Sequence, residues 1–516
     1  MLLYLFLLAL GAFAFFHYRK HQRAQRVEWL SGLAARKREE REESLEWARG
    51  EAASLPASER EAIAKMDFEQ LKESLASGSV SVSSAVKAYY SLALAAHEET
   101  NCLTVFIKES LHDAEELDKK AADPTWKKPA FFGIPISIKE CVSMKGYDQT
   151  RGYAESCFQP SKKDSLLIQQ LRLLGSLLPP SPQTPLPSGM VPFVQTNVPM
   201  SLLTYTCGNE IYGWTENPHK KGRTPGGSSG GEAALIAAKG SIIGIGGDVG
   251  GSIRTPAHFT GTAGFKEIWG SAWIADRDPY VPPLIWREKL ADKEAKYKIG
   301  YFTDDGWFKP TAGCERAYRL FVSCVCVDGG AFLIGKIEND LPPAIFLSAL
   351  MPLRLPLLVQ RLGGKIAGLL GYSRVRRMGH AMALSTAELR RNYAAIEKYR
   401  EHFLEAMQSA GVMPAPPHEA PLHLSAAVSY TALFNMLDYG AGVVRAGTWT
   451  PEDEANLSEY PTTDTWYTMV KKFSQDSVGL PLGAQIAAPP YREEAALKVL
   501  GDLEDAYEES VKGARR

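Results

Sequence analysis

One glycine-rich segment constrains this chain more than any other part of it. Residues 224–264 read TPGGSSGGEAALIAAKGSIIGIGGDVGGSIRTPAHFTGTAG. Because glycine adds almost no side-chain bulk, several backbone N–H groups in such loops can converge on one negatively charged oxygen. The segment therefore predicts a loop-built site for an anionic group, either a phosphate or an oxyanion that forms during a reaction.

The phosphate interpretation has little support. A P-loop requires Lys followed by Ser or Thr after its glycines, but Glu232 follows Gly231. GxGxxG spacings occur around Gly244, yet no ribose-binding acid is evident about 20 residues further on. A bound nucleotide is therefore disfavoured, and no cofactor is predicted.

The oxyanion interpretation starts from Gly250, Gly251 and Ser252. Their consecutive N–H groups can form a nest for an oxyanion, and Ser252 can attack from within that nest. Ser228 and Ser229 lie in a second flexible loop, GGSSGG. No Asp-x-His pattern accompanies these serines, so a conventional histidine triad is not indicated.

Lys139 is the remaining candidate for the base. It ends the apolar run FFGIPISIK at 131–139, which predicts a strand. Loss of hydration there would lower the pKa of the lysine and favour the neutral amine that accepts a proton. Taken alone, however, this residue is more simply interpreted as a surface lysine beside Glu140.

These motifs closely resemble the signature of the amidase signature hydrolases, and among them the fatty acid amide hydrolases. The resemblance implies the amidase signature fold, an α/β fold with a central mixed, twisted β-sheet surrounded by helices. It extends over most of residues 60–510 and includes FFGIPISIKECVSMKGYDQTRGY (131–153), VPFVQTNVPMSLLTY (191–205), GWTENPHKKGRTPGGSSGGEAALI (213–236), AVSYTALFNMLDYGAGVV (427–444) and SVGLPLGAQ (477–485).

The resemblance also implies roles for individual residues. Ser252 is the implied nucleophile, Ser228 the serine that relays its proton, and Lys139 the base. The other implied site residues are the oxyanion donors Val249, Gly250, Gly251 and Ser252, the loop-supporting Ser229, Asp248 and Arg254, and the acyl-chain-binding Leu202, Leu203, Tyr430 and Phe434. No His/Cys cluster has metal-ligand spacing, so no metal is predicted.

The N-terminal segment points to a membrane. An unbroken apolar run from Leu2 to Phe16 is followed by HYRKHQRAQR, without an earlier basic residue or a later cleavage site. This predicts a membrane anchor helix over 1–18 rather than a cleaved signal peptide, with the catalytic body facing the cytosol. Because about 20 residues are needed to cross the hydrocarbon core, an interfacial helix is the alternative.

A charged helical linker is predicted over 19–60 and the amidase signature domain over 61–516. Within that domain, residues 341–372 are strongly apolar, but four prolines exclude one continuous spanning helix. Two interfacial helices and an ordinary pair of core helices both fit this pattern. The resemblance favours the first, a membrane-docking cap, and implies a homodimer on an endomembrane such as the endoplasmic reticulum.

The sequence departs from the family pattern at three places. A Pro/Ser-rich stretch at 176–190 is interpreted as an insertion, and sheet segments are missing near 267–297 and near 330–340. These breaks leave the motifs intact but remove parts of the sheet that would hold them. They raise the alternative of a catalytically weak or silent membrane-associated homologue that binds lipid or a partner protein.

The predicted function is therefore a serine amidase that hydrolyses long-chain fatty acid amides to a fatty acid and an amine. An amidase for small polar amides is a further alternative, which the apolar segment at 341–372 disfavours. The formal net charge of −1 provides no field that would gather nucleic acid. Seven cysteines without a CxxC pair fit a reducing compartment.

Overall fold

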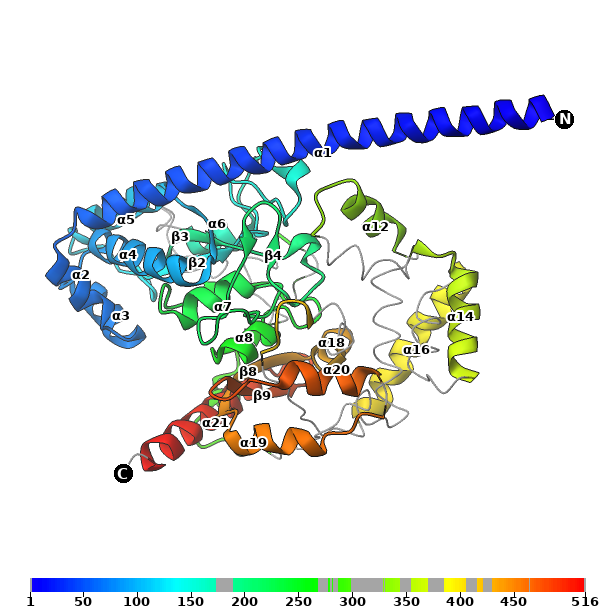
Figure 1. The fold of residues 1–516 in the computed structure, drawn as a ribbon. Helices are drawn as coiled ribbons and strands as arrows, with labels where there is room; N and C mark the ends of the chain where they lie inside the picture. Colours follow the sequence, from blue (N-terminus) through cyan, green and yellow to red (C-terminus); the bar gives the residue numbers. More distant parts are fainter. Residues whose placement is uncertain are drawn as a thin grey trace.

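The computed structural model describes most of the chain as an assembly of helices and short β-sheets (Figure 1). The insertion predicted at 176–190, except for its last two residues, lies outside the described residues, as do parts of 267–297 and of 341–372. The described residues are 2–172, 189–267, 277–278, 281, 286–297, 328, 330–343, 354–369, 385–404, 415–420, 429–463 and 465–514.

The apolar N-terminal run and the charged linker as far as Ala53 form one continuous helix, α1 (Leu2–Ala53), and the last residues of the predicted linker begin α2. It runs along one side of the molecule, and its N-terminal end projects beyond the body (Figure 1). Further along the helix, the buried Lys37 is ion-paired with Asp148 over 2.7 Å. In the part of the chain that the structure describes, no helix has the length and hydropathy required to cross a membrane. The spanning anchor over 1–18 stays a prediction.

Four helices follow α1, and the last two of them pack against the first sheet: α2 (Ala57–Ala64), α3 (Phe68–Ser77), α4 (Val82–Thr100) and α5 (Glu109–Ala121). The central one, α4, begins where Ser81 accepts a hydrogen bond from the Ser84 N–H, and it packs against α1, α2 and α5. Its alanines and tyrosines are buried between these helices and the sheet, which anchors the core of the N-terminal half.

The first sheet has the strand order β1 (Leu103–Phe106), β3 (Val191–Thr196), β2 (Pro135–Lys139) and β6 (Gly244–Ile245). The apolar run predicted as a strand therefore forms β2, which is buried along its whole length and pairs in parallel with β3 and β6. Such burial on both faces explains why β2 is apolar without alternation. Parallel pairing also brings the carboxyl ends of β2 and β3 together.

The second main sheet is antiparallel and consists of β7 (Gly264–Lys266), β8 (Gly440–Thr448) and β9 (Pro481–Ala488). The helices α8 (Arg254–Thr260) and α21 (Glu493–Ala514) pack against it. Among the described residues, no strand ladder joins this sheet to the first one. The central sheet expected from the sequence is thus present as separate parts, and β7 is followed directly by the segment predicted to lack strands.

A helix in the predicted cap, α14 (Leu357–Leu369), carries large apolar side chains that face solvent. Leu358 is 72% exposed, Leu362 is 59% exposed and Leu369 is 88% exposed. The remaining elements are η1 (Ala154–Ser156), α6 (Leu166–Arg172), η2 (Met200–Leu202), β4 (Gly208–Asn209), β5 (Gly213–Trp214), α7 (Gly230–Ala237), α10 (Glu288–Ala291), α12 (Ala331–Glu338), α16 (Thr386–Leu404), α18 (Ser429–Met436), α19 (Pro451–Asn456), η5 (Leu457–Glu459) and α20 (Thr465–Ser474).

Candidate active site

Lys139 and Ser228 form the buried end of the candidate site. Lys139 is the last residue of β2, and Ser228 lies in the loop that leads into α7. Lys139 Nζ donates a hydrogen bond to Ser228 Oγ over 2.7 Å and a longer one to the Gly247 carbonyl over 3.3 Å. Burial lowers the pKa of Lys139, which favours the neutral amine. The interpretation of Lys139 as a surface lysine is therefore wrong.

Ser252 lies beside this pair on the loop between β6 and α8. Its carbonyl oxygen accepts a hydrogen bond from the Ser229 N–H over 3.0 Å, which holds the two serine-bearing loops together. Ser252 is half-buried, whereas Lys139 and Ser228 are buried. Among the described residues, no hydrogen bond joins the hydroxyl groups of Ser252 and Ser228. These three residues are called the serine–lysine site below.

The backbone amides around Ser252 differ in their availability. The Gly251 N–H donates to Asp248 Oδ1 over 2.8 Å, so it is already engaged. Within the described residues, the N–H groups of Val249, Gly250 and Ser252 have no hydrogen-bond acceptor. Three of the four predicted oxyanion donors are therefore free to stabilise a negatively charged oxygen.

Gly251 is required by the geometry of this loop. Its φ angle is +118°, and a Cβ atom added there would lie 1.9 Å from Thr431 Oγ1. Side chains rarely adopt this backbone conformation, and the space is occupied. The glycine thus leaves room for Thr431 to pack against the loop, where its hydroxyl donates a hydrogen bond to the Gly250 carbonyl over 2.6 Å.

A buried ion pair fixes the other side of the loop. Arg254 Nη2 and Nε donate to the Asp248 carboxylate over 2.9 and 3.0 Å, and the two side chains are 0% and 1% exposed. Asp248 also accepts a hydrogen bond from the Ile253 N–H. Burial alone would raise the pKa of Asp248, but the Arg254 guanidinium holds it well below its ordinary value. The carboxylate is therefore ionised throughout the neutral range.

Several residues that support the loop were not predicted from the sequence. Asn435 Nδ2 donates to the Asp248 carbonyl over 2.8 Å, and Gln485 Oε1 accepts from Arg254 Nη1 over 2.8 Å. Both belong to segments quoted for the family resemblance, 427–444 and 477–485, in which they are polar residues among apolar ones. That contrast was the available signal.

Glu232 was also missed, although it lies in the first turn of α7 close to the serines. Ser137 Oγ donates to its carboxylate over 2.6 Å, and Thr196 Oγ1 donates over 2.7 Å. Burial raises the pKa of Glu232 to about 7. From the sequence, Glu232 indicated only that the glycine-rich loop is not a P-loop.

The four predicted acyl-chain residues lie in different surroundings. Phe434 is buried in an apolar cluster that includes Leu433 and Tyr439, whereas Leu202 and Leu203 lie outside that cluster. Leu202 is half-buried and Leu203 is 52% exposed. The carbonyl of the half-buried Tyr430 accepts a hydrogen bond from Gln485 Nε2. The role of these four residues in binding an acyl chain stays a prediction.

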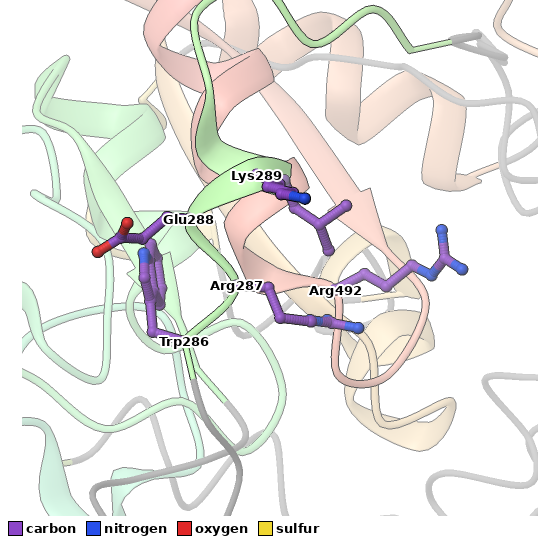
Figure 2. A pocket seen from close by; sticks show the side chains of 6 residues that line it. Trp286, Arg287, Glu288, Lys289 and Arg492 are labelled. Atoms are coloured by element: carbon purple, nitrogen blue, oxygen red, sulfur yellow. The ribbon is translucent and has the colours of Figure 1, made fainter.

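A separate hollow of about 470 Å³ lies between α10 and the start of α21 (Figure 2). Arg287, on its wall, is ion-paired with Glu494 over 3.1 Å. None of the residues predicted for the site lines this hollow, so it is distinct from the serine–lysine site. Its walls are formed by Trp286, Arg287, Glu288, Lys289, Leu290 and Arg492.

The sequence model of the amidase family matches residues 84–272 and 361–497, so this chain belongs to the amidase family and is an amide hydrolase. Fatty acid amide hydrolase 1 of Caenorhabditis elegans is 38% identical over 98% of this chain and 99% of its own length. Fatty-acid amide hydrolase 1 of Sus scrofa is 30% identical over 92% of each chain. A solved structure of fatty acid amide hydrolase superimposes with a TM-score of 0.68 and 21% identity over 89% of this chain and 88% of that chain, which shows a shared fold.

The alignment with the worm protein also bears on the predicted breaks. It spans 583 positions, which exceeds the 516 residues of this chain. The worm protein therefore contains residues that have no counterpart here. That the missing residues fall near 267–297 and 330–340 stays a prediction.

Proposed function

We propose that this protein hydrolyses long-chain fatty acid amides through a relay of Ser252, Ser228 and Lys139. The observation that carries the proposal is the buried hydrogen bond of 2.7 Å between Lys139 Nζ and Ser228 Oγ, next to the loop of Ser252. A nucleophile needs an oriented base, and a lysine deprived of water can supply one. The likeness to two named fatty acid amide hydrolases supports the choice of substrate class.

In the proposed mechanism, Ser252 Oγ attacks the amide carbonyl carbon and passes its proton to Ser228, which passes its own proton to neutral Lys139. The carbonyl oxygen becomes an oxyanion that the free N–H groups of Val249, Gly250 and Ser252 stabilise. The proton on Lys139 then returns through Ser228 to the leaving amine as the C–N bond breaks. Water then attacks the acyl carbonyl and gives a proton through Ser228 to Lys139, and a proton returns through Ser228 to Ser252 Oγ as the ester bond breaks and the fatty acid leaves.

The apolar surface of the protein supports a lipid substrate. The solvent-facing leucines of α14 and the projecting apolar end of α1 are suited to a membrane interface, where long-chain amides reside. The basic residues that follow the apolar run support a catalytic body in the cytosol, and the resemblance to fatty acid amide hydrolases is the basis for expecting an endomembrane. The resemblance to fatty acid amide hydrolases is the basis for expecting a homodimer.

The first prediction concerns substrate class. Purified protein in detergent micelles is expected to hydrolyse oleamide with a kcat/KM at least about 100-fold above that for acetamide, because the long chain adds apolar contacts. A fluorophosphonate probe is expected to label Ser252, as mass spectrometry of the labelled peptide would show. Product amine is measured for both substrates in the same preparation.

Two other results would each select an alternative. Folded protein that binds oleamide but neither turns it over nor reacts with the probe would indicate the silent homologue. A higher kcat/KM for acetamide than for oleamide would indicate an amidase for small polar amides.

The second prediction concerns the membrane surface. Replacing both Leu358 and Leu362 of α14 with Glu is expected to weaken binding to phosphatidylcholine vesicles at least about tenfold, because two exposed apolar anchors are lost. Vesicle co-sedimentation measures the binding. The control is Leu497→Glu, which changes a partly exposed leucine of α21 that lies away from α14 (Figure 1). Equal binding by the double variant and the unaltered protein would exclude α14 as the docking face.

A further inference from the structure

Glu232 occupies a position from which it can act on both members of the buried pair. It follows Ser228 by four residues, at the start of α7. Its carboxylate accepts hydrogen bonds from Ser137 on β2 and from Thr196 on β3. Ser137 is two residues before Lys139 on the same face of the strand, and Thr196 is the register partner of Lys139. Both hydroxyl groups that hold Glu232 are therefore close neighbours of the lysine.

The absence of a side chain at Gly244 leaves room for this carboxylate. On the neighbouring strand β6, a Cβ atom added to Gly244 would lie 1.9 Å from Glu232 Oε2. Any side chain there would push the carboxylate away from β2. Strands β2, β3 and β6 thus converge on one buried acidic group that the proposed relay of serines and lysine does not itself require.

We propose that Glu232 is a positioning residue: it locks the start of α7, and with it Ser228, against Lys139, and its charge sets the pH range in which Lys139 accepts a proton. This inference rests on the proposed function, because it assumes that neutral Lys139 is the base. Glu232 acts through Lys139 and Ser228 rather than through the substrate.

The charges around Lys139 single out Glu232. The ionisable groups that face the lysine are Cys141, Asp248, Cys207 and Glu232. Asp248 is neutralised by its ion pair, and burial raises the pKa of both thiols, that of Cys207 to about 11, so they are uncharged near neutral pH. Of these four groups, Glu232 is the one whose charge changes near pH 7.

The surroundings of Glu232 itself contain Lys139 and the buried thiol of Cys102. Burial raises the pKa of Cys102 to about 12, so this thiol also carries no charge near neutral pH. An ionised Glu232 favours the protonated form of Lys139, whereas a neutral group in its place favours the free amine. Removing the negative charge should therefore extend activity toward lower pH.

The test is the pH dependence of kcat/KM for oleamide in Glu232→Gln. Glutamine fills the same space without the charge, so the acid limb of the profile is expected to move to lower pH by at least half a unit. Glu232→Asp keeps the charge and is expected to retain the position of the limb, with a reduced kcat because the shorter side chain reaches Ser137 and Thr196 poorly. Glu116→Gln, which changes an exposed carboxylate of α5, is the matched control with no shift.

A second variant covers the case in which Glu232→Gln does not fold. Ser137→Ala removes one hydrogen bond that lowers the pKa of Glu232, so Glu232 becomes neutral over a wider range and the acid limb moves in the same direction. An unchanged limb in both folded variants, with an active parent enzyme, would overturn the role of Glu232. Absence of probe labelling at Ser252 in the unaltered protein would instead overturn the proposed function.

Discussion

Replacing Ser252 with alanine is expected to lower kcat/KM for oleamide by at least about 10³-fold while the fold stays intact. The hydroxyl of Ser252 is the atom that would form the acyl-enzyme bond, and no neighbouring group in the described loop can replace it. Its side chain makes no hydrogen bond with the described residues, and only its backbone holds the Ser229 loop. The change should therefore abolish acyl transfer to the enzyme and leave the thermal unfolding transition unaltered.

Initial rates at several oleamide concentrations measure this loss, and thermal unfolding checks the fold. Ser77→Ala, which alters an exposed serine at the end of α3, serves as the control and should keep full activity. If the Ser252 variant kept more than about a tenth of the activity, another nucleophile would have to be sought. Probe labelling at Ser228 in that variant would identify the replacement.

Replacing Asp248 with alanine is expected to lower the free energy of unfolding by about 3–5 kcal/mol, because breaking a buried ion pair leaves an uncompensated charge. The guanidinium of Arg254 is 0% exposed and would keep only neutral acceptors such as Gln485 Oε1. The N–H groups of Gly251 and Ile253 would lose their acceptor as well. The oxyanion loop would be disordered and activity would fall together with stability.

The pH dependence of this effect has a defined sign. The pKa of Asp248 is depressed in the folded protein, so its contribution is fully present above the unfolded value of about 3.9 and is lost as the pH falls below it. Urea unfolding at pH 7 and at pH 3 is expected to show a smaller difference between Asp248→Ala and the unaltered protein at the lower pH. Asp505→Ala, at an exposed site on α21, is the control.

The sequence predicted the parts of the site that local motifs determine. The apolar run before Lys139 becomes a buried strand, and a hydrogen bond from the Ser229 N–H to the Ser252 carbonyl joins the two glycine loops that carry the serines. Glu232 was missed because its partners, Ser137 and Thr196, are supplied by strands 95 and 36 residues away. A contact of that kind depends on strand order, which no local pattern contains.

The same limit applies to the scaffold. Asn435 and Gln485 reach the Asp248–Arg254 pair from 187 and 231 residues away along the chain. The expectation of one central sheet followed from the family pattern, whereas the described strands form separate sheets. The boundary placed between an anchor and a linker followed from composition alone, and helix α1 crosses it because no proline occurs between Leu2 and Ala53.

Because α1 is continuous, the number of residues between its apolar end and Lys37 determines how that end is oriented. A helix turns about 100° and advances about 1.5 Å per residue. The direction in which the apolar end faces is therefore fixed relative to Lys37, where the ion pair with Asp148 attaches the helix to the rest of the protein. Adding or deleting one residue between Phe16 and Lys37 would swing the apolar side chains through about 100° around the helix axis. A flexible tether would absorb such a change, whereas this continuous helix would turn its apolar end relative to the body that carries the serine–lysine site.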